Sequence, residues 1–149
     1  AMFKGLNIAS GGMSAQRARL HVISSNIANA STTRTEDGGP YKRQEAVFRT
    51  TLPEGWAEAV KEGLPKGAVA DMSLRGVEVS EVQKDNVPGP IIFDPGHPDA
   101  DENGNVELPN VNPVEEMVDM IAASRSFEAN AQSFQTLRDM VMRAMDIGR

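Results

Sequence analysis

A short run of residues has the types and the spacing of calcium ligands. Positions one, three, five, six and eight of an EF-hand loop are filled by Asp99, Asp101, Asn103, Gly104 and Val106. Position twelve is Asn110, where the loop requires a bidentate glutamate, and Pro95 and Pro98 exclude the incoming helix. We therefore expect no metal site here but an Asx-rich turn that positions Val106 and Leu108. A calcium-binding module stays open as an alternative.

Groups for catalysis are scarce in the chain. His21 and His97 are the only histidines, and the residues four positions from His21 are Arg17 and Ser25, neither of them a metal ligand. Serine occurs without a Gly-x-Ser-x-Gly elbow, and no glycine-rich phosphate loop follows a strand. Cysteine is absent, which excludes disulfides, thiolate metal sites and a cysteine nucleophile. We expect a protein that is not an enzyme and has no cofactor.

Charge and hydropathy exclude further classes of protein. The formal net charge is -6, whereas phosphate binding needs clustered Lys and Arg, so we expect no nucleic acid partner. No apolar run approaches the ~20 residues of a transmembrane helix, so we expect no membrane insertion. Ala1 before Met2 has the form of a cloning scar, and the start lacks the apolar core of a cleaved secretory signal. Any export would use an uncleaved signal.

The last stretch of the chain has complete start and stop signals for a helix over 113–147. Asn112 is a good N-cap before Pro113, Glu115 has the spacing of a capping box, and Gly148 suits a left-handed C-terminal closure. Apolar and small residues between them alternate at spacings of three and four, which is a heptad seam. The seam comprises Met120, Ala123, Phe127, Asn130, Phe134, Leu137, Val141 and Ala144.

A matching helix is predicted over 3–30. Its seam is Leu6, Ala9, Met13, Gln16, Leu20, Ile23, Ile27 and Ala30, and Asn29 suits the helix end. Glycines near its start weaken it by ~1 kcal/mol each relative to alanine. This helix is basic and the C-terminal one is acidic, so the two are expected to pair with each other or with copies. A basic, acid-poor start is also typical of a mitochondrial transit peptide, although such a peptide needs no matching seam.

The segment between the helices is a small β module of about three short strands. The strands are expected within 41–52, 77–82 and 91–93, with a short helical segment at 56–62. The predicted fold class is therefore α+β, with long N- and C-terminal coiled-coil helices and a small β-rich middle module. The expected domains are an N-terminal helix over 2–34, a middle module over 35–112 and a C-terminal helix over 113–149.

Several motifs together resemble one protein family. Ser25-Asn26-Ile27-Ala28-Asn29, followed by Thr32 and Thr33, is similar to the N-terminal signature of bacterial flagellar axial proteins, which form the rod and hook. Further segments resemble the proximal rod branch: Asp94–Asp101, Pro109–Asn112, Glu115–Val118, Ser124–Asn130 and Ile147–Arg149. Phe127 stands where the family commonly has tyrosine, and Trp56 to Leu64 has the appearance of a local variation.

The resemblance implies a structural subunit of the flagellar basal body that serves motility. Such subunits leave the cytoplasm uncleaved through the flagellar type III export apparatus. They polymerise with other rod proteins and with copies of themselves into a hollow drive shaft that transmits torque across the periplasm. The terminal helices would form its inner coiled-coil layer. A coiled-coil adaptor or export chaperone is the alternative.

Assembly and packing are expected to depend on the heptad positions of both helices and on nearby asparagines. These residues are Leu6, Met13, Leu20, Ile23, Asn26, Ile27, Asn29, Met120, Phe127, Asn130, Phe134, Leu137 and Val141.

Overall fold

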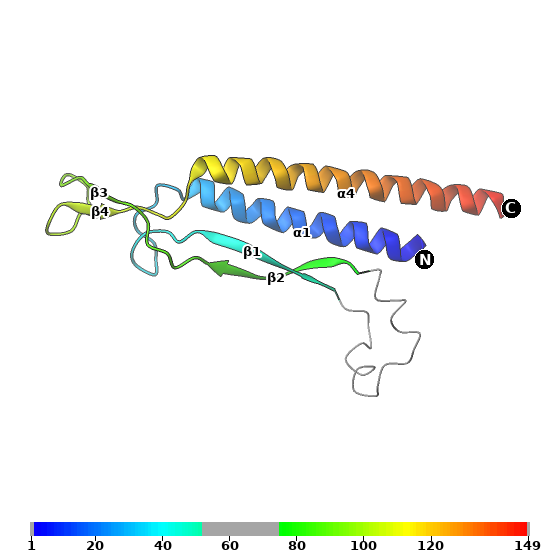
Figure 1. Ribbon diagram of the computed structural model, residues 1–149, viewed down its shortest axis with the longest axis horizontal. Helices are drawn as coiled ribbons and strands as arrows, with labels where there is room; N and C mark the ends of the chain where they lie inside the picture. Colours follow the sequence, from blue (N-terminus) through cyan, green and yellow to red (C-terminus); the bar gives the residue numbers. More distant parts are fainter. Residues whose placement is uncertain (1, 52–74, 149) are drawn as a thin grey trace, which may run out of the picture. The chain divides into compact units, whose positions relative to one another are not determined.

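A computed structural model describes residues 2–51 and 75–148 of the chain (Figure 1). In chain order the elements are α1 (Met2–Ala28), β1 (Gln44–Thr50), β2 (Val77–Lys84), β3 (Ile91–Phe93), β4 (Asn105–Glu107) and α4 (Pro113–Ile147). The predicted combination of two long terminal helices with a small β-rich middle is confirmed. The predicted helical segment at 56–62 lies outside the described residues. No described helix is both long enough and apolar enough to cross a membrane.

The chain divides into two compact units, which we describe separately. The first unit comprises Ala1–Arg17, Phe48–Ser80 and Arg125–Arg149, and the second comprises Ala18–Val47 and Glu81–Ser124. Each unit therefore contains a length of α1 and a length of α4. Both long helices are continuous through the division of the chain.

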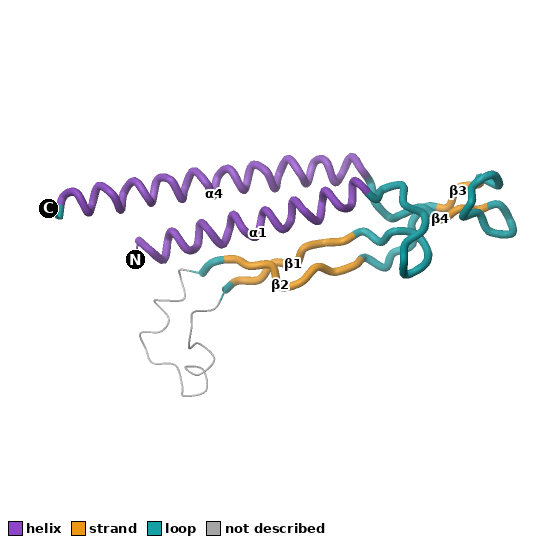
Figure 2. The backbone as a smooth tube through the Cα atoms, turned by 180° about the vertical axis from the view of Figure 1, so that it is seen from behind, coloured by secondary structure: helices purple, strands orange, loops and turns teal. Residues whose placement is uncertain are grey.

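The four strands within residues 2–51 and 75–148 form two separate two-stranded sheets (Figure 2). At one end of β1, the N–H of Thr51 donates to the Gly76 carbonyl, and at the other end the N–H of Asp85 donates to the Arg43 carbonyl. The order of these bonds makes β1 and β2 antiparallel. β3 and β4 are also antiparallel, with Ile92 opposite Val106. β4 was not predicted, because three residues with one apolar side chain carry too little periodic signal.

In the first unit, α1 and α4 approach closely through glycine. A Cβ atom on Gly12 would lie 2.9 Å from the Oδ1 atom of Asn130, and one on Gly5 would lie 3.3 Å from a methyl group of Leu137. Glycine therefore admits the opposite helix at these two positions. The sequence predicted that these glycines weaken α1, and the packing gives them a compensating role.

In the second unit, the two helices contact each other through polar groups. The Asn26 amide donates to Glu116 over 3.0 Å, and Arg19 lies 3.7 Å from the carboxylate of Asp119. The apolar side chains of Ile23 and Ala123 are buried in the same unit.

The ends of the helices follow the predicted chemistry only in part. Asn112 is the N-cap of α4, because its Oδ1 atom accepts the N–H of Val114 over 3.1 Å. Glu115 is exposed, and no capping-box bond to Asn112 occurs within residues 75–148. The predicted left-handed closure at Gly148 is wrong: its φ is not positive, and its N–H donates to the Ala144 carbonyl in the ordinary helical pattern.

Candidate functional site

The second unit contains a group of polar side chains that we call the polar cluster: Asn26, Tyr41, Arg43, Gln44 and Glu116. Asn26 is 0% exposed and Glu116 is 1% exposed. Polar groups this deeply buried are stable only when they are hydrogen-bonded. The cluster is therefore a specific structural device rather than part of a solvated surface.

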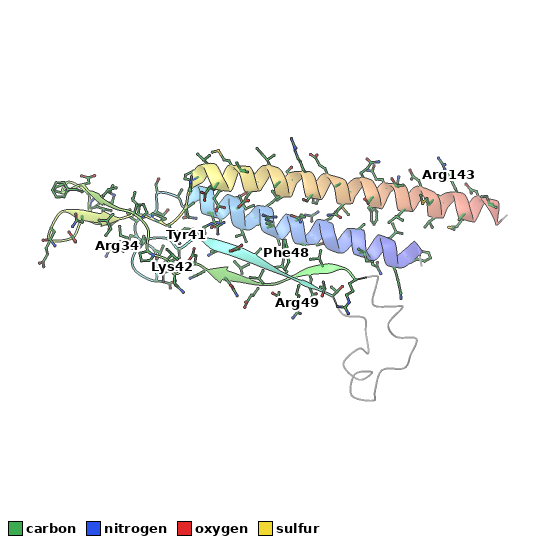
Figure 3. All side chains as sticks on the ribbon, in the orientation of Figure 1. Arg34, Tyr41, Lys42, Phe48, Arg49 and Arg143 are labelled. Carbon is green, nitrogen blue, oxygen red and sulfur yellow. The ribbon has the colours of Figure 1, made fainter. Side chains whose placement is uncertain are left out.

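Asn26 binds β1 in the way that a neighbouring strand would. Its amide nitrogen donates to the Gln44 carbonyl over 2.8 Å, and its oxygen accepts the Gln44 N–H over 2.9 Å. The same oxygen accepts the hydroxyl of Tyr41 over 3.0 Å. Tyr41 is labelled just before β1 in Figure 3. One side chain of α1 thus satisfies both backbone groups of a strand residue, which fixes the first strand of the middle module against the N-terminal helix.

Glu116 joins this arrangement from α4. Its Oε2 atom accepts the Asn26 amide over 3.0 Å, and its Oε1 atom accepts the Nε–H of Arg43 over 2.6 Å. Burial lowers the pKa of Arg43, but the hydrogen bond and charge of Glu116, with Glu45 and Asp119, outweigh it, so the pKa is raised. Arg43 therefore remains a cation. A charge-assisted bond in this setting links α4, β1 and α1.

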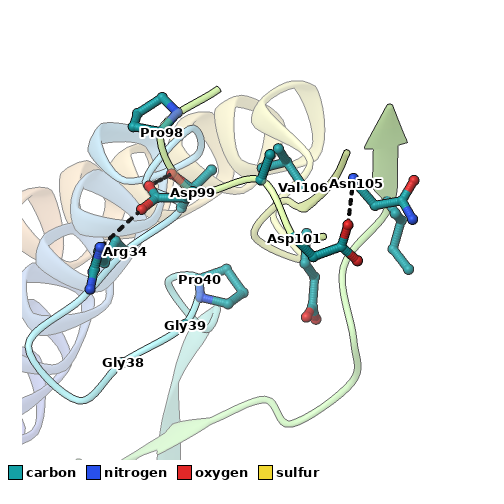
Figure 4. A pocket seen from close by; sticks show the side chains of 13 residues that line it. Arg34, Gly38, Gly39, Pro40, Pro98, Asp99, Asp101, Asn105 and Val106 are labelled. Atoms are coloured by element: carbon teal, nitrogen blue, oxygen red, sulfur yellow. Dashed lines mark hydrogen bonds and ion pairs between the residues drawn. The ribbon is translucent and has the colours of Figure 1, made fainter. Parts of the chain in front are cut away.

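The candidate calcium ligands are occupied by donors of the protein itself. Asp99 accepts the Thr33 hydroxyl over 2.8 Å and lies 3.4 Å from Arg34 (Figure 4). One oxygen of Asp101 accepts the N–H groups of Asn103 and Asn105, both over 2.8 Å. The described residues contain no group of three or more His, Cys, Asp or Glu side chains placed to hold a metal ion. The geometry is that of the predicted Asx-rich turn.

Electrostatics in this turn follow from its hydrogen bonds. The backbone N–H of Asn105, with that of Asn103, stabilises the carboxylate and lowers the pKa of Asp101. His97 is also engaged in the turn, since its Nδ1 atom accepts the Asp99 N–H over 3.1 Å. The turn leads into β4, where Val106 is buried.

The predicted assembly residues all lie on covered sides of the helices. Ile23 and Asn26 are buried, and the others are half-buried: Leu6, Met13, Leu20, Ile27, Asn29, Met120, Phe127, Asn130, Phe134, Leu137 and Val141. In the first unit, the guanidinium of Arg17 lies 5.9 Å from the centre of the Phe127 ring. Asn29 closes α1, because its amide donates to the Ser25 carbonyl over 2.9 Å. The role of these residues in assembly stays a prediction.

Other apolar side chains of α4 are exposed instead. In the second unit we call Val114, Met117, Val118 and Ile121 the α4 apolar patch, and they are 53–68% exposed. Their spacing of three and four places them on one side of the helix. In the first unit, Met140, Met142, Met145 and Ile147 are exposed. Exposed apolar groups gathered in this way are typical of interaction sites.

Sequence reasoning gave a role to only one member of the polar cluster, Asn26. It gave Arg43 no role, and it placed Glu116 only within the segment Glu115–Val118 that resembles the family. A faint signal existed, because Glu116 lies seven residues before Ala123 and four before Met120, in register with the predicted seam. No signal in the sequence alone pairs it with an arginine that is 73 residues distant.

Two known protein families match the two ends of the chain. The family described as "Flagella basal body rod protein" matches residues 6–34, and the family described as "Flagellar basal body rod FlgEFG protein C-terminal" matches residues 102–147. Neither description indicates catalysis.

Relatives that align with almost the whole chain identify the protein family more closely. The chain is 45% identical to the flagellar basal-body rod protein FlgC of Borreliella burgdorferi, with 98% of the chain and 97% of the relative covered. It is 40% identical to FlgC of Aquifex aeolicus, covering 97% of the chain and 96% of the relative. Identity to FlgC of Bacillus subtilis is 34%, with 99% and 98% covered. Because these matches span almost the whole of both chains, the chain belongs to the FlgC family of flagellar basal-body rod proteins.

Proposed function

We propose that this protein is a structural subunit of the proximal rod of the bacterial flagellum, in the basal body. It polymerises with other rod proteins and with its own copies into the hollow drive shaft that transmits torque across the periplasm. Three relatives that the chain matches over nearly their whole length are named as flagellar basal-body rod proteins. The structural observation that supports polymerisation is the exposed apolar side of α4.

The α4 apolar patch supports polymerisation for an energetic reason. Four large apolar side chains spaced along two turns of one helix remain in contact with water. Burying each of them would contribute on the order of 1.5–3 kcal/mol before the entropy of association is subtracted. The methionines of the first unit add flexible side chains that adapt to neighbours of different shape. A subunit touched by several neighbours uses surfaces of this kind.

The two long helices support a place in an inner coiled-coil layer. The half-buried residues of α4 recur at the spacing of a heptad seam through Phe127, Phe134 and Val141. Head-to-tail contacts between such subunits form a closed ring only if their rotation returns to the first subunit. Where it does not, they generate a helical tube. The chain would reach the periplasm through the flagellar export apparatus. Terminal helices completed only by neighbours suit passage through a narrow channel.

A coiled-coil adaptor or export chaperone is the alternative to this role. A rod subunit and an adaptor would both contain long helices, so helix content alone does not distinguish the two roles. The names of the relatives favour the rod subunit, because all three are basal-body rod proteins rather than chaperones.

Deletion of the gene and isolation of basal bodies test the proposal. We expect the deletion strain to lack complete rods in electron cryotomography and to be non-motile. Restored basal bodies should contain this chain as a stoichiometric component in mass spectrometry. If the chain remained in the cytoplasm beside exported substrates while complete rods formed without it, the adaptor would be the better assignment.

A further inference from the structure

The outer edge of β3 has unpaired backbone groups. The N–H of Asp94 donates to the Gly104 carbonyl over 2.8 Å, and the N–H of Leu108 donates to the Pro90 carbonyl over 2.9 Å. With Ile92 opposite Val106, these bonds make Ile92 the residue that exchanges hydrogen bonds with β4. The N–H and C=O groups of Ile91 and Phe93 must then point away from β4. Among the described residues, no strand other than β4 pairs with β3.

The side chains of this edge are apolar and exposed. Ile91 is 68% exposed and Phe93 is 72% exposed, and their alternate spacing places both on one face of the strand. Natural edge strands are usually protected by charged side chains or by proline. Here Pro90 and Pro95 limit the length of the strand, but none of its three residues is charged. An open, apolar edge of this kind is suited to the addition of another strand.

Charge indicates which strand can be added. The β3–β4 hairpin, residues 91–107, contains no Lys or Arg and carries five acidic residues: Asp94, Asp99, Asp101, Glu102 and Glu107. Pairing this edge with the same edge of a second copy would bring two such hairpins together, and like charges would repel. The complementary occupant is an extended segment that has Lys or Arg beside its apolar residues.

A cavity that Ile91 lines, together with residues of β4, provides room for a basic side chain. It has a volume of about 570 Å³, and Ile91, Asp101 and Glu107 are among the residues that line it (Figure 4). Arg34 is the cation in this lining, and its charge is already matched by Asp99. The wall next to Ile91 therefore has a surplus of negative charge.

We propose that the outer edge of β3 binds an extended segment of a different polypeptide, in which apolar residues alternate and lysine or arginine flanks them. The segment adds a third strand to the β3–β4 hairpin and places a basic side chain in the adjacent cavity. Because the partner is taken to be another subunit of the flagellar basal body, the inference rests on the proposed function. It adds a docking site in the middle module to the contacts of the helices.

Binding of a synthetic peptide to the full chain tests the edge directly. The probe is a fluorescein-labelled peptide of alternating valine and threonine with two lysines at each end, measured by fluorescence anisotropy. Two control peptides carry glutamate in place of lysine, or N-methyl groups on alternate residues that block strand pairing. We expect each control to bind at least tenfold more weakly.

Variants of the chain locate the binding. Ile91→Pro removes an outward N–H without removing a bond to β4, and should weaken binding at least tenfold. Ile91→Val keeps the N–H and should bind as the unchanged chain does. Glu107→Lys should weaken binding of the lysine peptide at least threefold. Nuclear magnetic resonance of the Asp94 and Leu108 amides would verify that the hairpin persists in each variant.

Three results would overturn the inference. The first is absence of binding by the lysine peptide, and the second is equal binding of the N-methylated peptide. The third is self-association of the chain that Ile91→Pro abolishes, which would make a second copy the occupant. None of these results bears on the gene-deletion experiment, so the rod assignment and the edge site can fail separately.

Discussion

The carboxylate of Glu116 is the buried charge on which the polar cluster depends. Replacing it by alanine would take from Arg43 its nearest carboxylate, although Arg43 is 26% exposed and keeps Glu45 at 3.7 Å. It would also take from the Asn26 amide one of its two acceptors. A hydrogen bond to a charged group typically contributes ~1.5–3 kcal/mol. We expect Glu116→Ala to lower the free energy of unfolding by about that amount, measured by urea unfolding with circular dichroism.

The chain offers a matched control one residue earlier. Glu115 is an exposed glutamate in the same helical turn, so Glu115→Ala should change the free energy of unfolding by no more than ~0.5 kcal/mol. Both substitutions remove the same charge from the helix N-terminus. If the two variants were equally stable, the cluster would contribute nothing beyond the interaction with the helix dipole.

The lowered pKa of Asp101 predicts that the stability of one turn depends on pH. Its pKa is lowered in the folded chain, so the carboxylate stabilises the turn above the pKa of the unfolded chain. That stabilisation is lost as the pH falls through the folded pKa. Amide chemical shifts of Asn103 and Asn105 should therefore titrate together, with a midpoint below the ordinary aspartate value. The same amides in Asp101→Asn should show no such step, and its presence there would assign the titration to another group.

At the scale of elements, the contact between α1 and α4 in the first unit depends on the absence of a side chain at Gly12. Alanine is better than glycine in a helix interior by ~1 kcal/mol, whereas overpacking a contact costs ~1–3 kcal/mol. A Cβ on Gly12 would meet the amide of Asn130 at 2.9 Å. We therefore expect Gly12→Ala to destabilise the chain or leave it unchanged.

A double-mutant cycle separates the two effects. In an Asn130→Ala background the obstruction is gone, and Gly12→Ala should stabilise the chain by ~1 kcal/mol through helix propensity alone. Thermal unfolding of the four proteins gives the coupling energy. A coupling near zero would mean that Asn130 moves aside freely and that the close approach is unimportant.

Helix propensity and periodicity predicted the long elements well. The predicted helix over 113–147 coincides with α4, and the helix over 3–30 differs from α1 only at its ends. The caps were less predictable, because Glu115 and Gly148 have the right types at the right spacing but adopt other roles. Short strands such as β4 depend on a turn made by Asp101 and Gly104, and local patterns of apolar residues do not reveal them.

At the scale of the whole molecule, the sequence predicted the family but not the buried polar contacts that organise the second unit. Heptad spacing identifies a covered side of each helix, yet it does not say which residues of that side meet each other. Asn26 was predicted from the family signature as an assembly residue, and in this chain it binds Gln44 and Glu116. Long-range pairing of Arg43 with Glu116 is a property of the tertiary structure and leaves no periodic trace.

A substitution in the α4 apolar patch should impair assembly while leaving the stability of the folded chain unchanged. Val118 is 61% exposed, so Val118→Glu should alter the free energy of unfolding by no more than ~0.5 kcal/mol. In an assembled rod the same glutamate would be an unpaired charge in an apolar contact, and we expect incorporation to fall at least tenfold, or ~1.4 kcal/mol. Gln132→Glu introduces the same side chain at an exposed polar position of α4 and should assemble normally. The amount of each variant in purified basal bodies, by quantitative mass spectrometry, measures the difference. Equal incorporation of the two variants would place the contact elsewhere on α4.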